Sequence, residues 1–140
     1  MKKAQKIQMA VLVSVGILFL LIIGSIWYGT IPPKIIITSE QIKITGMYGT
    51  EINVGDIEKV SLSNEIPKIL ARANGLGMSP IRKGYFILEK FGRTKLFLQS
   101  YEPPYIIVES NGDDVIIINY KDPELTKSYY MEILKTVNRY

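Results

Sequence analysis

The sequence has no cysteine and no histidine among its 140 residues. Without cysteine there can be no disulfide framework, no thiol nucleophile and no Cys-ligated zinc or iron–sulfur cluster. Without histidine the chain lacks the commonest general base and the commonest transition-metal ligand. A nucleophilic hydroxyl would need a lysine base, and no Ser-x-x-Lys pair stands in a helix-forming context. We therefore expect no enzyme activity, no cofactor and no metal site.

Strong net charge is also lacking. The chain carries 17 Lys and Arg against 13 Asp and Glu, a formal net charge of +4. Three of these positive charges belong to the N-terminal tail, so the remaining residues are almost balanced. Proteins that bind nucleic acids in general carry a strong basic surface. We expect no nucleic-acid partner.

A long uncharged run is the clearest feature that the sequence does have. Residues 9–28 carry no charge and are mostly Val, Leu, Ile, Phe and Met. A helix of this length, at about 1.5 Å per residue, matches the roughly 30 Å hydrocarbon thickness of a bilayer. The alternative is a cleaved signal peptide, whose apolar core is about 7–15 residues and precedes small residues. Here the run is longer and ends in Trp27 and Tyr28, so we expect a short basic tail and transmembrane helix over residues 1–28, in contact with lipid through residues 9–28.

The flanking lysines predict the orientation of this helix. Lys2, Lys3 and Lys6 precede it, whereas Lys34 and Lys43 are the only bases within about 15–20 residues after it. The positive-inside rule then favours a single-pass protein of the cell membrane with its N-terminus inside and its C-terminal domain outside. Residues 29–33, Gly-Thr-Ile-Pro-Pro, form a stiff connector that reaches only about 15 Å. The domain that follows, residues 34–140, is expected to lie close to the bilayer surface.

From residue 34 onward the pattern becomes that of β-strands. Alternating or β-branched runs separated by turn residues predict seven or eight strands at hairpin spacing, typical of an antiparallel barrel or sandwich. These runs are residues 41–45, 59–63, 84–89, 95–99, 105–109 and 115–119. Residues 74–80, with two glycines and a closing proline, predict a long loop.

The last part of the domain predicts one helix. Asp122 is a suitable N-cap for a helix that begins at Pro123. Leu125, Ile133 and Val137 then recur at helical spacing on one face. A helix of about sixteen residues with one apolar face would cover an open end of a barrel.

Several linked motifs resemble the bacterial PH-like (pleckstrin-homology-like) domains found in small membrane proteins. The motifs, in chain order, are Ile44–Gly49, Arg72–Gly75, Lys83–Phe86, Lys95–Phe97, Pro104–Ile106, Ile118–Asn119 and Asp122–Tyr129. The resemblance implies a mainly β domain with one C-terminal α-helix, namely a PH-like seven-stranded antiparallel barrel capped by the helix. It implies no catalytic residues. Ala73 stands where the family would have Thr.

Basic residues concentrate in one stretch of the domain. Residues 68–95 hold seven bases and only one acid, Glu89. Bases near an anionic surface each contribute up to about 1 kcal/mol to binding. The candidate contacts for an anionic ligand or partner are Arg72, Asn74, Arg82, Lys83, Arg93 and Lys95. The alternative is that these side chains scatter over several faces and only solubilise the domain.

Two further features sit in predicted turns. Met47 and Tyr48 form a candidate exposed hydrophobic contact for a partner or the bilayer, unless they fold back over the end of the barrel. Asp113 and Asp114 follow Asn111-Gly112, and turn chemistry explains them better than a carboxylate pair or a calcium site.

These observations together predict a membrane-anchored PH-like domain that acts as a non-catalytic binding or scaffolding module and contacts another membrane protein. One alternative is binding of an anionic lipid or an envelope polymer through residues 68–95. An enzyme or enzyme subunit is the alternative of a different class.

Overall fold

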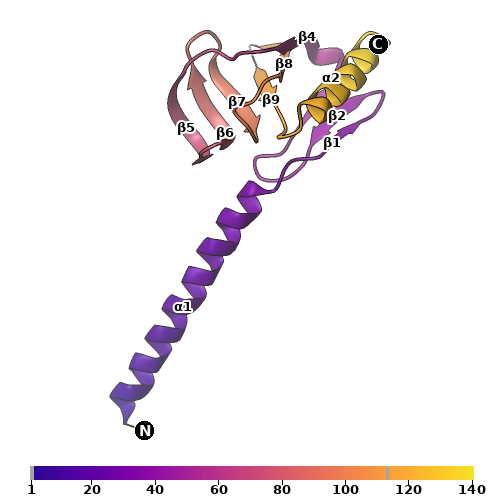
Figure 1. Cartoon of the computed structure of the whole chain (residues 1–140). Coiled ribbons are helices and arrows are strands. Elements are labelled where there is room, and N and C mark those ends of the chain that lie inside the picture. Colours follow the sequence, from indigo (N-terminus) through magenta and orange to yellow (C-terminus); the bar gives the residue numbers. More distant parts are fainter. Residues whose placement is uncertain (1, 113) are drawn as a thin grey trace. The chain divides into compact units, whose positions relative to one another are not determined.

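The computed structural model describes residues 2–112 and 114–140, which form two compact units divided after Ile31. The first unit is a single helix, α1 (Lys3–Thr30) (Figure 1). Its large apolar side chains are exposed, from 39% at Ile26 to 71% at Leu20. In length and composition α1 fits a membrane span or a signal sequence.

The second unit, Pro32–Tyr140, contains two β-sheets and a helix. The smaller sheet is a meander of three antiparallel strands, β1 (Ile35–Ile37), β2 (Gln41–Ile44) and β3 (Thr50–Asn53). A 3₁₀ turn, η1 (Val54–Asp56), leads out of it.

The larger sheet has six strands in the order β4-β8-β9-β7-β6-β5 (Figure 1). The strands are β4 (Ile57–Ser63), β5 (Ile69–Met78), β6 (Ile81–Leu88), β7 (Gly92–Leu98), β8 (Tyr105–Ser110) and β9 (Val115–Ile118). Neighbours pair antiparallel except β7 and β9, which pair parallel. The last element is α2 (Pro123–Val137).

The two edge strands of the larger sheet, β4 and β5, follow one another in the chain, and only residues 64–68 join them. Ile66 in this link packs on one face of the sheet, over a buried cluster that includes Phe86, Leu96 and Ile117. The opposite face carries a second cluster, shared with the smaller sheet.

This second cluster is the main core of the unit. It joins Ile42 and Ile52 of the smaller sheet to Phe97 and Ile118 of the larger sheet and to Ile133 of α2. Helix α2 packs on β4, β8 and β1. The predicted β-rich domain with a C-terminal helix is therefore confirmed.

The predicted barrel of seven antiparallel strands is not what the structure contains. It contains nine strands in two open sheets, and no ladder joins the sheets among residues 2–112 and 114–140. Alternation of apolar residues indicates that a segment is a strand, but it carries no information about the partner or its direction. The parallel β7–β9 pair arises because β8 intervenes between them in the chain and lies on the far side of β9.

The prediction of a long loop over residues 74–80 is also wrong, because residues 74–78 belong to β5. The glycines serve close packing of strands. A Cβ on Gly75 would collide with the Lys83 carbonyl oxygen, and one on Gly84 would lie 2.6 Å from the Asn74 carbonyl oxygen. Gly84 also has φ +104, a conformation that other residues rarely adopt.

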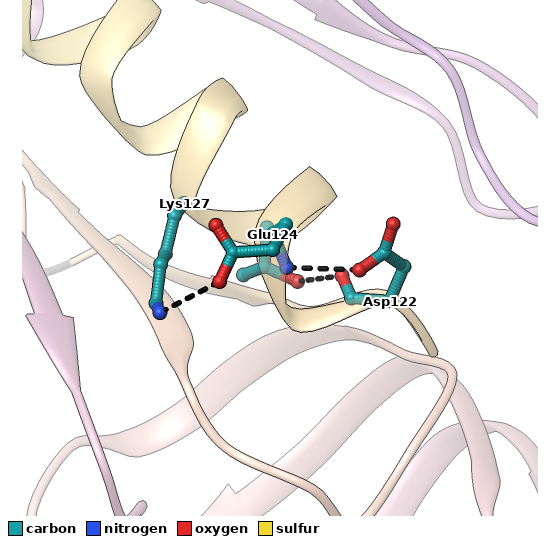
Figure 2. Close-up of polar contacts among 4 residues, drawn as sticks. Asp122, Glu124 and Lys127 are labelled. Atoms are coloured by element: carbon teal, nitrogen blue, oxygen red, sulfur yellow. Dashed lines mark hydrogen bonds and ion pairs between the residues drawn. The ribbon is translucent and has the colours of Figure 1, made fainter.

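The predicted start of α2 is confirmed. The Asp122 carboxylate accepts a hydrogen bond of 3.0 Å from the Glu124 backbone N–H, and Pro123 occupies the first turn (Figure 2). Lys127 forms an ion pair of 3.0 Å with Glu124 one turn on. The cap satisfies one of the N–H groups that a helix start leaves without a partner.

Candidate functional site

The six polar candidates from the basic stretch do not form one surface. Lys83, on β6, is fully buried, and burial lowers its pKa from the ordinary lysine value. Arg72 and Asn74 are exposed on the edge strand β5, where the Arg72 guanidinium lies beside Gly77. Lys83 therefore takes no part in a solvent-facing surface, and Arg72 and Asn74 lie on the edge strand β5.

Arg82 belongs to a small polar group around Tyr101. Its guanidinium carbon lies 5.1 Å from the centre of the Tyr101 ring, and one of its nitrogens lies 3.4 Å from the Tyr101 hydroxyl oxygen. That hydroxyl also forms a hydrogen bond with Ser79. The contacts with Ser79 and then Arg82 lower the pKa of Tyr101 below its ordinary value. The Arg82 side chain thus already has an aromatic and a hydroxyl partner.

Arg93 and Lys95 are the two candidates that the structure does bring together. They stand two residues apart on β7, hence on the same face of the sheet. The Arg93 guanidinium carbon lies 4.2 Å from the centre of the Tyr85 ring, and the Lys95 ammonium nitrogen 5.1 Å from it. Tyr85 was not among the predicted site residues, although it lies within the Lys83–Phe86 motif, and it pairs with Lys95 across the β6–β7 ladder.

Met47 and Tyr48, the hydrophobic candidates, are both half-buried. Tyr48 packs against the main core, and its ring would lie 3.2 Å from a Cβ on Gly84. Its backbone adopts φ +62 in the turn before β3, a conformation uncommon for a residue other than glycine. Of the two alternatives for this turn, the geometry favours folding back over an exposed contact.

The face with Arg93 and Lys95 opens into a cleft of about 750 Å³. The other walls are strand β3 and the turn between β8 and β9. The lining includes Thr50, Glu51, Ile52, Asn53, Asp56, Tyr85, Arg93, Lys95, Ser110, Asn111 and Asp114. Sequence reasoning missed this cleft, because β3 and β7 are distant in the chain and no motif relates them.

Two acidic side chains of the cleft have partners within the structure, whereas the third, Asp114, is exposed and forms no ion pair among the described residues. Glu51 forms an ion pair of 3.0 Å with Lys43, and the Asp56 carboxylate accepts a hydrogen bond of 3.1 Å from Asn53. Arg93 and Lys95 contact aromatic rings, and no acid pairs with either in the described part of the chain. The cleft therefore has two cations available to an anion.

One buried hydroxyl in the cleft lining has no partner. The Ser110 side chain is 9% exposed, and its oxygen makes no hydrogen bond among the residues that the structure describes. Such a group costs about 1–3 kcal/mol while it stays unsatisfied. Of the two aspartates in the adjacent turn, Asp114 is exposed and Asp113 lies outside the described residues.

Comparison of the chain with protein-family models, with curated proteins and with solved structures finds no match.

Proposed function

We propose that this protein is a single-pass, membrane-anchored, non-catalytic binding module that contacts another membrane protein at the membrane surface. Helix α1 supports the anchor, because its apolar side chains are exposed and need a covering that the described chain does not supply. Helix α1 extends through Thr30, so only residues 31–33 of the expected connector 29–33 are non-helical, and so short a link keeps the domain close to the bilayer. Anchoring concentrates the domain near its partner, so each contact can be individually weak.

The single observation that carries a protein partner is the free edge of β5. This strand has ten residues, only Arg72 among them is charged, and β6 is its one paired neighbour in the described structure. Leu70 and Met78 are 56% and 42% exposed. A long, weakly charged edge is a template for a strand of another chain, because its outer N–H and C=O groups are unpaired.

Site-directed photo-crosslinking tests this contact. The chain has no native cysteine, so Ala73→Cys on β5 and Ser128→Cys on the exposed side of α2 each give one attachment point for a benzophenone maleimide. We expect a discrete membrane-protein adduct in native membranes from position 73 only, and its loss when Leu70→Lys is added. Equal adducts from both positions, or an adduct that survives Leu70→Lys, would contradict the proposal.

We further propose that the domain faces outward, on the strength of the three lysines before α1. Asn111→Cys places a lone thiol in an exposed turn. A membrane-impermeant maleimide should label it in intact cells. If labelling requires lysis, the orientation is reversed and the basic residues face the anionic cytoplasmic leaflet.

The second candidate function is binding of an anionic lipid or envelope polymer, favoured by the adjacent Arg93 and Lys95. Binding through these cations should collapse between low and high ionic strength, whereas a strand-pairing contact should change little. An enzyme function is the remaining alternative. A measurable turnover that is lost on Arg72→Gln, with folding intact, would establish it.

We also propose a distant kinship with bacterial PH-like domains. The linked sequence motifs support it, as does a C-terminal helix packed at one end of a β-rich domain. The open sheets and the parallel β7–β9 pair depart from the seven-stranded barrel of that family, so the kinship rests on the motifs and on α2. Homologous sequences that keep these motifs and link this chain to PH-like domains would sustain the kinship, and homologues in which the motif positions vary freely would contradict it.

A further inference from the structure

Strand β3 presents a backbone edge to the cleft. It pairs with β2 on one side and with no strand on the other among the described residues. All four of its residues, Thr50–Asn53, line the cleft, although successive side chains in a strand point to opposite faces. What they share is the free edge, where alternate N–H and C=O groups point away from β2. An edge of this kind accepts another extended backbone.

The facing wall carries a charge of one sign. Arg93 and Lys95 both lie within about 5 Å of the Tyr85 ring centre, so the two like charges are close together. Like charges repel, and an anion placed beside both relieves that repulsion. Glu51 and Asp56 do not do so, because they are engaged with Lys43 and Asn53. The third acid of the cleft, Asp114, is exposed and forms no ion pair with either cation among the described residues.

We propose that this cleft binds an extended peptide segment that carries an acidic side chain. The segment adds a fourth strand to the smaller sheet, beside β3. Its inward side chains face the larger sheet, where a carboxylate contacts Arg93 and Lys95. The hydroxyl of Ser110, buried in the cleft lining without a partner, provides a further hydrogen-bonding group.

A peptide fits these observations better than a lipid headgroup or a free phosphate. A phosphate would use the two cations but would leave the β3 edge unpaired. Only another backbone supplies donors and acceptors that alternate with the spacing of a strand. The cleft is separate from the β5 edge, so a failure of the proposed β5 contact would not contradict peptide binding in the cleft.

Fluorescence polarisation with the full chain in dodecyl maltoside micelles tests the site. The probe is a fluorescein-labelled peptide, Thr-Val-Asp-Val-Asp-Val-Thr, with two matched controls. One control has Asn in place of Asp, and the other has N-methyl groups on alternate backbone nitrogens in the two possible registers. We expect the Asn peptide to bind about tenfold or more weakly, because it loses a charge-assisted contact. We expect the same loss for one N-methyl register only, the one whose methylated nitrogens face β3.

Variants of the protein assign the binding to the cleft. Arg93→Gln with Lys95→Gln should weaken the Asp peptide about tenfold or more and leave the Asn peptide unchanged. Arg72→Gln, which removes an exposed base outside the cleft, should change neither, and Leu70→Lys on β5 should likewise have no effect. Circular dichroism and thermal unfolding verify that each variant folds.

Three results would overturn the proposal. The first is no saturable binding of the Asp peptide up to about 1 mM. The second is equal binding of the Asp and Asn peptides. The third is peptide binding that N-methylation leaves unchanged and that phosphatidylglycerol vesicles compete away, with the competition dependent on Arg93 and Lys95. That result would make the cleft a binding site for anionic lipid.

Discussion

Helix α1 and strand β9 are built from the same kinds of side chain and have opposite surroundings. Large apolar residues of α1 are 39–71% exposed, whereas Val115–Ile118 of β9 are 0–7% exposed. Strand β9 is central in its sheet and is covered on both faces. Ile116 and Ile118 point into the main core, and Val115 and Ile117 point into the cluster on the opposite face of the sheet, with Phe86 and Leu96. Burial within the sheet explains the apolar run of β9, whereas the exposed run of α1 fits a membrane span or a signal sequence.

The largest effect expected from this contrast is in the domain core. Ile117 is fully buried, so Ile117→Ala removes buried methyl groups and leaves a cavity that costs about 2–5 kcal/mol of unfolding free energy. Leu18→Ala on α1, at a side chain that is 57% exposed, should leave the unfolding of the domain unchanged. Denaturant titration of the full chain in micelles, followed by β-sheet circular dichroism, measures both.

The same two variants provide controls that separate membrane association from domain stability. Ile117→Ala should stay in the membrane fraction after alkaline carbonate extraction, because the substitution leaves the proposed anchor, α1, unchanged. A domain destabilisation by Leu18→Ala as large as that of Ile117→Ala would contradict the contrast, since it would mean that α1 packs within the fold.

A charge in the middle of α1 gives the next largest effect. It should weaken membrane insertion and leave the domain folded, the reverse of the effect of Ile117→Ala. Leu18→Arg places a cation near the centre of residues 9–28, which costs about 2.5–3.5 kcal/mol in membrane insertion. We expect the variant to appear in the carbonate-soluble fraction with the domain still folded. Leu18→Ile is the matched control and should remain membrane-bound. Retention of the Arg variant in the membrane would argue against a simple single span.

A smaller effect is expected where the chain enters the domain. The buried Tyr120 hydroxyl donates a hydrogen bond of 2.7 Å to the Pro33 carbonyl oxygen, 87 residues earlier. Tyr120→Phe keeps the ring stack on Tyr129 but leaves that carbonyl without its donor, at a cost of about 1–3 kcal/mol. Tyr129→Phe keeps the same stack and should cost much less. Equal losses from the two variants would show that the hydrogen bond to Pro33 contributes nothing.

The same tyrosine makes stability depend on alkaline pH. Burial raises the pKa of Tyr120 above its ordinary value, so the folded state keeps this proton when the unfolded chain has lost it. The stabilisation is present below about pH 10, the unfolded pKa, and decreases as the pH rises further. Denaturant titrations at several pH values should therefore give a steeper alkaline loss for the wild type than for Tyr120→Phe. Parallel curves for the two proteins would contradict this.

Local features of the sequence predicted local structure well. The uncharged run 9–28 corresponds to α1, and the alternating segments correspond to strands. The helix start predicted at Asp122-Pro123 corresponds to the start of α2. Pairing could not be predicted in this way, because β7 and β9 are brought together by β8, which lies between them in the chain. The glycines of 74–80 misled for a related reason. Gly75 reflects the close approach of β6, a contact that no local pattern records.

The candidate site shows the same limit. Composition located the basic stretch, and the i, i+2 spacing of Arg93 and Lys95 on a strand placed them on one face. The burial of Lys83, the ring of Tyr85 and the facing edge of β3 depend on how two sheets pack. The fold therefore uses only part of the basic stretch as solvent-facing charge.

The smallest expected effect concerns α2. The start of this helix is stabilised by a local hydrogen bond, in contrast to the buried strand β9 and the exposed helix α1. Asp122→Ala removes the acceptor for the Glu124 N–H and should lower the unfolding free energy by about 1 kcal/mol. Asp122→Ser keeps an acceptor and should restore most of the loss, whereas Glu124→Gln removes only an exposed charge and should matter less. Denaturant titration resolves these differences. If Asp122→Ala costs nothing, α2 is held by its packing on β4, β8 and β1 alone, and its dependence on a local cap disappears.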